Sequence, residues 1–291
     1  MRASRLWPRL ALGCLLWSAS AVALAQAQTI ASPAPQTQSP PQAIASAPVP
    51  DDEMEEIEEL EEEVGDRDPT YLRTRLVFRY DYKRLRGPSS IDRFRLRLLY
   101  GFGPKQRFAV SFLQPVIQTD TPLRTARGSG DAEVQFNANA VNKERFRAGA
   151  AVQATLQTSS DVLLGGATTT IKPSGDLTGV LSSHVELTAA FYYKQSIRTT
   201  RGIRAKQFEP DVTLNARALD VTWFLEWDSY YDFLPDRFAQ TLKPGISRAF
   251  GASRRWVASA YYATGINDYA RLSQYRYNAG LDVTWYPRKY R

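Results

Sequence analysis

Residues 91–102 read IDRFRLRLLYGF, and their apolar and basic side chains alternate. The apolar side chains occupy every second position: Phe94, Leu96, Leu98, Tyr100 and Phe102. Arginines lie between them: Arg93, Arg95 and Arg97. A period of two indicates a β-strand whose two faces meet different surroundings. On a soluble sheet these are a core and water, whereas on a closed membrane barrel they are lipid outside and a polar lumen inside.

The preceding stretch, residues 71–83, repeats this alternation. One face carries apolar, aromatic and threonine side chains: Leu72, Thr74, Leu76, Phe78, Tyr80 and Tyr82. The other face is charged: Arg73, Arg75, Arg79, Asp81 and Lys83. The polar link RLRGPSS joins the two stretches, so we expect them to be neighbouring strands of one sheet.

Strand periodicity continues to the end of the chain in twelve segments: 71–83, 91–102, 107–118, 131–141, 145–157, 169–181, 185–196, 207–218, 221–231, 240–250, 256–264 and 275–286. Long polar links alternate with short ones such as NKE, SSH and LD. A β-sandwich has no reason to alternate in this way, but an up-and-down membrane barrel with tight periplasmic turns and longer external loops does. The sequence therefore predicts an all-β fold, an up-and-down antiparallel transmembrane β-barrel of about twelve strands over residues 69–291.

Prolines fall inside four of the predicted strands: Pro115, Pro173, Pro210 and Pro244. Each proline removes one donor from the strand ladder. We expect bulges or displaced strand ends at these positions.

The first residues have the pattern of a secretory signal. Arginines precede an apolar run over residues 10–25, and the small residues Ala23 and Ala25 frame a cleavage site. Residues 1–25 are therefore predicted to be a signal peptide, and the only cysteine, Cys14, lies inside it. No later apolar run has the length of a spanning helix, and the mean hydropathy is -0.38, so a helical membrane protein is excluded.

Two segments of biased composition follow the signal. Residues 26–50 are rich in Pro, Ala and Gln, and we expect a disordered tether. Residues 51–68, DDEMEEIEELEEEVGDRD, are acidic, and their few apolar side chains fall within one arc of a helix. Two interpretations of this periplasmic segment stay open: a solvated or transient helix, or a helix that binds a periplasmic protein or serves as a mobile plug drawn to a basic lumen.

Charged side chains are expected to line the lumen in two groups. A basic wall comes from the first two strands: Arg73, Arg75, Arg79, Arg93, Arg95 and Arg97. Acidic groups come from the remaining strands: Asp131, Glu133, Glu186, Glu209, Asp211, Glu226, Asp228 and Asp282. Opposed walls would create a field across a pore and set its ion preference. The alternative is that these charges pair and fill a closed interior, because twelve strands lie between small filled barrels and water-filled porins.

Catalytic and metal chemistry find little support. His184 is the only histidine, so carboxylates alone would have to supply the other ligands of a histidine-based metal site. No cofactor is predicted. Ser182, Ser183 and His184 invite a hydrolase hypothesis, but they fall in a predicted turn, which explains their residue types more simply. We predict that the protein is not an enzyme, and a lipid-modifying enzyme is only a third alternative.

Two stretches resemble a known family. SFLQPVI at residues 111–117 is followed by GSGDAEVQFNANAV at 128–141, and TSSDVLLGG is followed by PSGDLTGVLS within 158–182. These stretches resemble the outer-membrane transporter-like barrels of the meta-pathway of phenol degradation family, in which a glycine-rich G-x-G-D opens a strand. The resemblance covers residue 71 to the C-terminus and implies an aromatic-compound setting, without binding residues to carry over.

The sequence therefore predicts an outer-membrane barrel of a Gram-negative bacterium. We expect it to contact outer-membrane lipid and lipopolysaccharide and to admit small solutes passively, hydrophobic or aromatic ones among them. The alternative is a closed structural barrel whose residues 51–68 recruit a partner. Export of the chain argues against nucleic-acid binding, and the sequence names no substrate, gate or oligomeric state.

Overall fold

The computed structural model describes residues 67–287, except 86, 201, 203, 252–253 and 274–276. The predicted signal peptide, the tether and residues 51–66 of the acidic segment lie outside the described residues. In the described part of the chain, no helix is both long and apolar enough to cross a membrane.

The described residues form one sheet of antiparallel strands. The strands are β1 (Arg75–Arg84), β2 (Ser90–Phe102), β3 (Phe108–Asp120), β4 (Thr125–Ser129), β5 (Ala132–Lys143), β6 (Phe146–Leu156), β7 (Thr168–Ser182), β8 (Val185–Thr199), β9 (Lys206–Ala218), β10 (Val221–Asp232), β11 (Arg237–Phe250), β12 (Trp256–Gly265) and β13 (Tyr277–Trp285). Two short helical elements lie between strands: η2 (Pro104–Gln106) and α3 (Asp268–Ser273).

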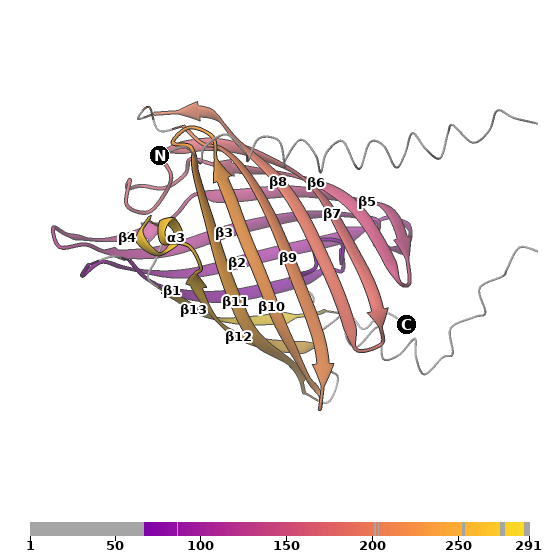
Figure 1. Cartoon of the computed structure of the whole chain (residues 1–291). Coiled ribbons are helices and arrows are strands. Elements are labelled where there is room, and N and C mark those ends of the chain that lie inside the picture. Colours follow the sequence, from indigo (N-terminus) through magenta and orange to yellow (C-terminus); the bar gives the residue numbers. More distant parts are fainter. Residues whose placement is uncertain are drawn as a thin grey trace, which may run out of the picture. The chain divides into compact units, whose positions relative to one another are not determined.

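The sheet closes on itself, because β1 pairs with β13 as well as with β2 (Figure 1). β4 and β5 pair with successive parts of β3 and together form one interrupted wall strand. The result is a closed barrel of twelve antiparallel strands. The predicted fold is confirmed, and each predicted segment corresponds to one strand of the barrel wall.

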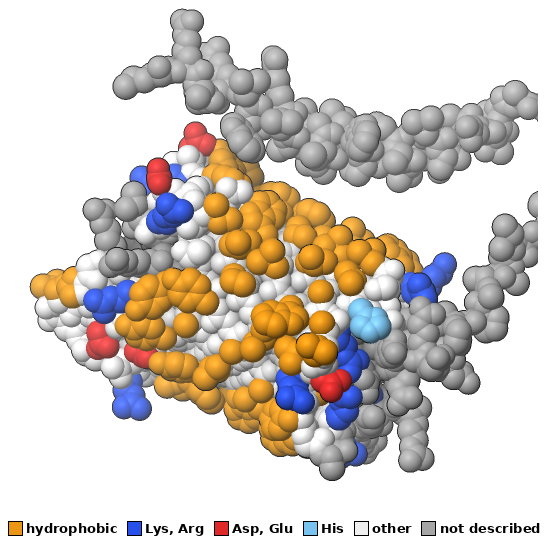
Figure 2. Space-filling model, turned by 60° about the horizontal axis from the view of Figure 1, so that its bottom comes forward, with side chains coloured by type: hydrophobic (Ala, Val, Ile, Leu, Met, Phe, Trp, Pro, Cys, Tyr) orange, Lys and Arg blue, Asp and Glu red, His pale blue; other side chains and the backbone are white. Residues whose placement is uncertain are grey.

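The period of two separates the faces of each wall strand. On β2, Leu98 is 51% and Tyr100 60% exposed, whereas their neighbour Leu99 is 5% exposed. The same alternation recurs on β3, where Phe112 is exposed and Leu113 is buried. Figure 2 shows the outward apolar side chains as a broad surface over the barrel wall, with charged side chains gathered toward its ends. Apolar surface of this extent is typical of a barrel surrounded by lipid.

The links between strands differ at the two ends of the barrel. The end with residues 103–107, 144–145, 183–184, 219–220 and 251–255 is called the short-turn end here. The opposite, long-loop end carries β4, the link 157–167 and α3 (Figure 1). Neither β4 nor α3 was expected, because both fall within links that look uniformly polar in the sequence.

The predicted start of the first strand at residue 71 is wrong, because β1 begins at Arg75. Residues 71–74 continue the alternation in the sequence but run inside the barrel. Leu72, expected to face outward, is 3% exposed and packs against the inward side chains Leu99 and Ala109. A Cβ on Gly101 would lie 2.0 Å from the carbonyl oxygen of Leu72, so only glycine at this position leaves room for the segment.

Strand prolines disturb the ladders less than expected. Pro115 lies opposite the junction of β4 and β5, where the register shifts by one residue, from Leu113↔Glu133 to Val116↔Ser129. In the ladders that the structure describes, the register does not shift at the other three prolines: Pro173, Pro210 and Pro244. At each of them, two consecutive pairs are missing from the ladder on one side, and the same register resumes beyond the gap. A local gap of this kind is expected where proline removes a donor. The expectation of bulges or displaced strand ends is therefore wrong for these three.

Candidate functional site

A segment that precedes the first strand crosses the lumen at the short-turn end. We call residues 67–74 the inner segment. Its Arg67 donates hydrogen bonds to Ser247 Oγ on β11 (2.8 Å) and Ser259 Oγ on β12 (3.1 Å). Asn139 on β5 reaches the segment from another part of the wall, and its Nδ2 donates to the carbonyl oxygen of Thr70 (2.7 Å). The inner segment is therefore held by two separate parts of the wall, the neighbouring strands β11 and β12 on one side and β5 on the other.

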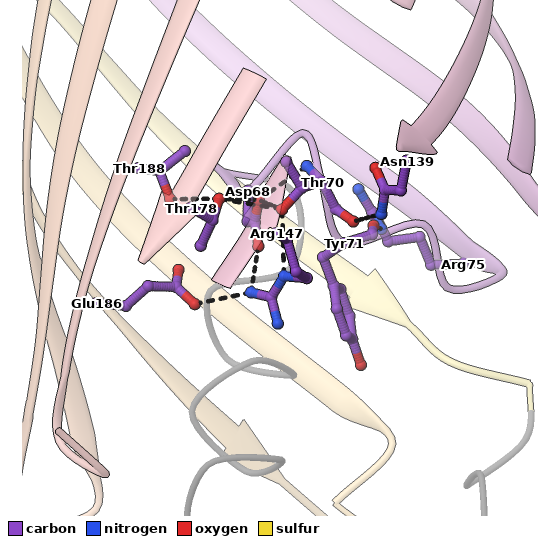
Figure 3. Close-up of polar contacts among 9 residues, drawn as sticks. All are labelled: Asp68, Thr70, Tyr71, Arg75, Asn139, Arg147, Thr178, Glu186 and Thr188. Carbon is purple, nitrogen blue, oxygen red and sulfur yellow. Dashed lines mark hydrogen bonds and ion pairs between the residues drawn. The ribbon is translucent and has the colours of Figure 1, made fainter. Parts of the chain in front are cut away.

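Asp68 is the buried centre of this attachment (Figure 3). Its Oδ1 accepts hydrogen bonds from the hydroxyls of Thr70 and Thr178, both at 2.7 Å. Arg147 Nη2 donates to Asp68 Oδ2 (2.6 Å) and to Glu186 Oε2 (3.0 Å). Asp68 is 1% and Glu186 0% exposed, so one guanidinium serves two buried carboxylates. Loss of one partner from such a group leaves an uncompensated buried charge, which typically costs about 3–5 kcal/mol.

Aromatic packing and two further arginines hold the second half of the inner segment. Tyr71 packs against Val257 and Tyr286, with the two tyrosine ring centroids 6.3 Å apart. Arg73 Nη1 donates to the Tyr71 hydroxyl (3.0 Å), and Arg75 Nη1 donates to the Tyr71 carbonyl oxygen (2.5 Å). Two of the arginines predicted for a basic lumen wall thus fix the inner segment.

Other predicted lumen residues form ion pairs between wall strands. Arg79 binds Asp282 in a forked pair, with distances of 2.5 and 2.7 Å. Arg95 Nη2 lies 2.5 Å from Asp81 Oδ2. Two lysines that the sequence analysis did not single out complete the set, Lys243 with Glu226 (2.5 Å) and Lys172 with Glu209. The period of two could have identified both lysines, since they share the inward face of their strands.

Two cavities in the described part of the lumen bear on its function. The larger, of about 360 Å³, lies toward the long-loop end and includes Arg93, Glu133 and Lys194 in its lining. The smaller, of about 120 Å³, lies against the inner segment and includes Arg67, Asp211 and Glu226. The lumen is therefore hollow at two levels.

Asp131 attaches the link between β6 and β7 to the larger cavity. Its Oδ1 accepts backbone N–H bonds from Thr158 (3.1 Å) and Ser159 (3.0 Å), and its Oδ2 accepts one from Gly166 (2.7 Å). A Cβ on Gly165 would lie 2.5 Å from Asp131 Oδ2, so this approach needs glycine. The GSGD and TSSDVLLGG stretches of the sequence are thus in contact, and Asp131 holds residues 157–167 over the lumen.

The remaining predicted residues do not join these groups. Arg97 lines a small recess with Arg79, and Asp228 pairs with Asp211 in the ladder between β10 and β9. Ser183 and His184 lie in the exposed turn between β7 and β8, with Ser183 Oγ 2.8 Å from His184 Nδ1. Among the described residues, no group of three or more His, Cys, Asp or Glu side chains is arranged to hold a metal ion.

Comparison with known proteins supports the fold by structure rather than by sequence. No family model matches the chain, and no curated protein matches it. An outer membrane channel from Pseudomonas putida F1 is similar with a TM-score of 0.59 and 11% identity, over 73% of this chain and 94% of that one. The NanC porin is similar with a TM-score of 0.54 and 13% identity, over 73% of this chain and 100% of that one. The resemblance to the meta-pathway family stays a prediction, and the protein has the fold of outer-membrane β-barrel channels.

Proposed function

We propose that the protein is an outer-membrane channel that admits small solutes by passive diffusion, and that the inner segment closes it at the short-turn end. The observation that carries this proposal is a charged, hollow lumen inside a barrel with an apolar outer surface. A polar lining stabilises water and polar solutes along the barrel axis. Hydrophobic and aromatic solutes belong to the proposal through the family resemblance alone.

The position of the inner segment supports a role as a closure. It lies outside the strand ladders, and β1 begins directly after it at Arg75. Its removal would therefore leave every ladder pair of the barrel in place. The acidic residues 51–66 join it at Arg67, and we propose that they lie in the periplasm, where a protein that binds them would act on the closure. The outer surface would contact membrane lipid and lipopolysaccharide.

Single-channel recording in planar bilayers tests this proposal. The mature protein is compared with a variant that lacks residues 26–72, and heat-modifiable gel mobility shows that both are folded. We expect the deletion to increase the size or frequency of discrete conductance steps, because it removes the chain that crosses the lumen. The matched control lacks residues 26–66 only, keeps the inner segment and should conduct like the mature protein.

A closed structural barrel is the second candidate, and the ion pairs favour it. Asp68, Arg147 and Glu186 fill one level of the lumen, and Arg79 with Asp282 fills another. A folded deletion variant that stays silent would contradict the channel and support this candidate. Function would then be sought in the acidic residues 51–66 as a partner-binding segment.

A further inference from the structure

The larger cavity contains an arginine that the ion-pair network leaves out. In the ladder between β1 and β2, Arg93 lies directly opposite Asp81. Asp81 nevertheless accepts its hydrogen bonds from Arg95 and from the hydroxyl of Tyr261. Within the described part of the chain, the Arg93 side chain makes no hydrogen bond or ion pair, and its Nε is buried. A partly buried guanidinium whose donors are not used in hydrogen bonds is suited to an anionic ligand.

The surface beside Arg93 is apolar. Its ladder partner on β3 is Ile117, which packs with Ala126 and Leu164 in a buried cluster. Ile91 and Leu163 pack against the same cluster. The carboxylate of Asp131 fixes the loop that carries both leucines. Ile91, Ile117, Leu163 and Leu164 all line the cavity, so an apolar surface adjoins the guanidinium.

The remaining charges of the cavity favour an anion. Arg95 is engaged by Asp81, and Asp131 by backbone N–H groups. Lys194 also lines the cavity, and among the described residues its side chain makes no hydrogen bond or ion pair. Glu133 is the other carboxylate in the lining. Two available cations therefore face one available carboxylate, which gives the cavity a net attraction for a monoanion.

We propose that this cavity is a binding site for a small monocarboxylate with an apolar body. The carboxylate lies on the Arg93 guanidinium, and the apolar body lies on Ile117 and Leu164. A volume of about 360 Å³ suits a small organic molecule, since ligand pockets commonly have roughly 300–1,000 Å³. The site rests on the proposed channel function for its purpose, because it names the class of solute that the lumen would select.

Calorimetric titration of the detergent-folded protein with cyclohexanecarboxylate tests the site without any need for conductance. Cyclohexylmethanol keeps the apolar body and removes the charge, and acetate keeps the charge and removes the body. We expect both to bind more weakly than cyclohexanecarboxylate. Arg93→Met should weaken cyclohexanecarboxylate binding about ten- to hundredfold, as expected for a lost hydrogen bond between charged groups.

Arg107→Met is the matched control, because Arg107 lies in the exposed link 103–107 outside the cavity. It should bind like the unchanged protein. Equal affinities for the carboxylate and the alcohol, or full affinity in folded Arg93→Met, would overturn the site. If Arg93→Met does not fold, the site is tested by Lys194→Met, which should also weaken binding of cyclohexanecarboxylate, and by the weaker binding of the alcohol to the unchanged protein. Conductance without carboxylate binding would remove the site and keep the channel, whereas binding without conductance would keep the site and remove the channel.

Discussion

At the scale of single residues, Arg147 decides whether two carboxylates can be buried together. Arg147→Met leaves Asp68 and Glu186 next to each other without their cation. We expect a loss of about 3–5 kcal/mol in the free energy of unfolding, if the inner segment stays in place. Urea titration followed by heat-modifiable mobility measures this loss. Addition of Asp68→Asn to the same protein removes one of the two charges and should restore part of the stability, and an unchanged midpoint for Arg147→Met would contradict the assigned role.

The sequence could predict the residue types of the lumen but not their partners. Alternation placed Arg79 and Asp282 on equivalent faces, yet their pairing depends on the contact between the first and last strands of the closed barrel. In the sequence, Asp68 is merely the end of the acidic segment, because its partners Arg147 and Thr178 lie far away along the chain. In the described part of the chain, Asp81 binds Arg95 and leaves the Arg93 side chain without a hydrogen bond. Alternation places both arginines on the inward face and cannot show which of them Asp81 binds.

At the scale of elements, the inner segment depends on a glycine of β2. A valine side chain at position 101 would occupy the space of the Leu72 carbonyl group. We therefore expect Gly101→Val to displace the inner segment and expose Arg67 and Arg73 to trypsin, while the barrel stays folded. Mass spectrometry of the products detects these cleavages. Gly175→Val is the control, because nothing lies within 4 Å of a Cβ there, and equal protection of both variants would show that the segment does not need Gly101.

Alternation predicts that a stretch is extended, but it does not say which surface each face meets. Residues 71–74 keep the pattern of β1, yet side chains of both faces are covered. Tyr71 packs on Val257 and Tyr286, and Leu72 packs on Leu99 and Ala109. At Pro210, where two β9–β10 pairs are missing, the strands stay in contact because Ser229 Oγ donates to the proline carbonyl oxygen (3.1 Å). Such local compensation depends on neighbouring strands and leaves no signal in a single segment.

At the scale of the whole molecule, the outer surface and the lumen face different surroundings. The exposed apolar face continues around the barrel, for example at Phe94, Phe136, Leu187, Leu225 and Leu281. Lipid can cover this face, whereas the inward charges must be paired or hydrated. The overall fold was predictable because closure imposes one simple rule on every strand. The path of the inner segment through the lumen was not predictable, because this segment pairs with no strand and the rule does not apply to it.

The charges that stay available in the lumen should set its ion preference once the inner segment is removed. In the variant that lacks residues 26–72, Arg93→Glu together with Lys194→Glu reverses both available cations of the larger cavity. We expect the reversal potential in a tenfold KCl gradient to shift toward cation preference, because the changed groups line the path of the ions. Lys105→Glu together with Lys143→Glu makes the same change of charge at exposed positions on the short-turn end and should shift the reversal potential less. An equal shift of the reversal potential in both variants would place the larger cavity outside the conduction path. The field at the pore mouth would then be the source of selectivity.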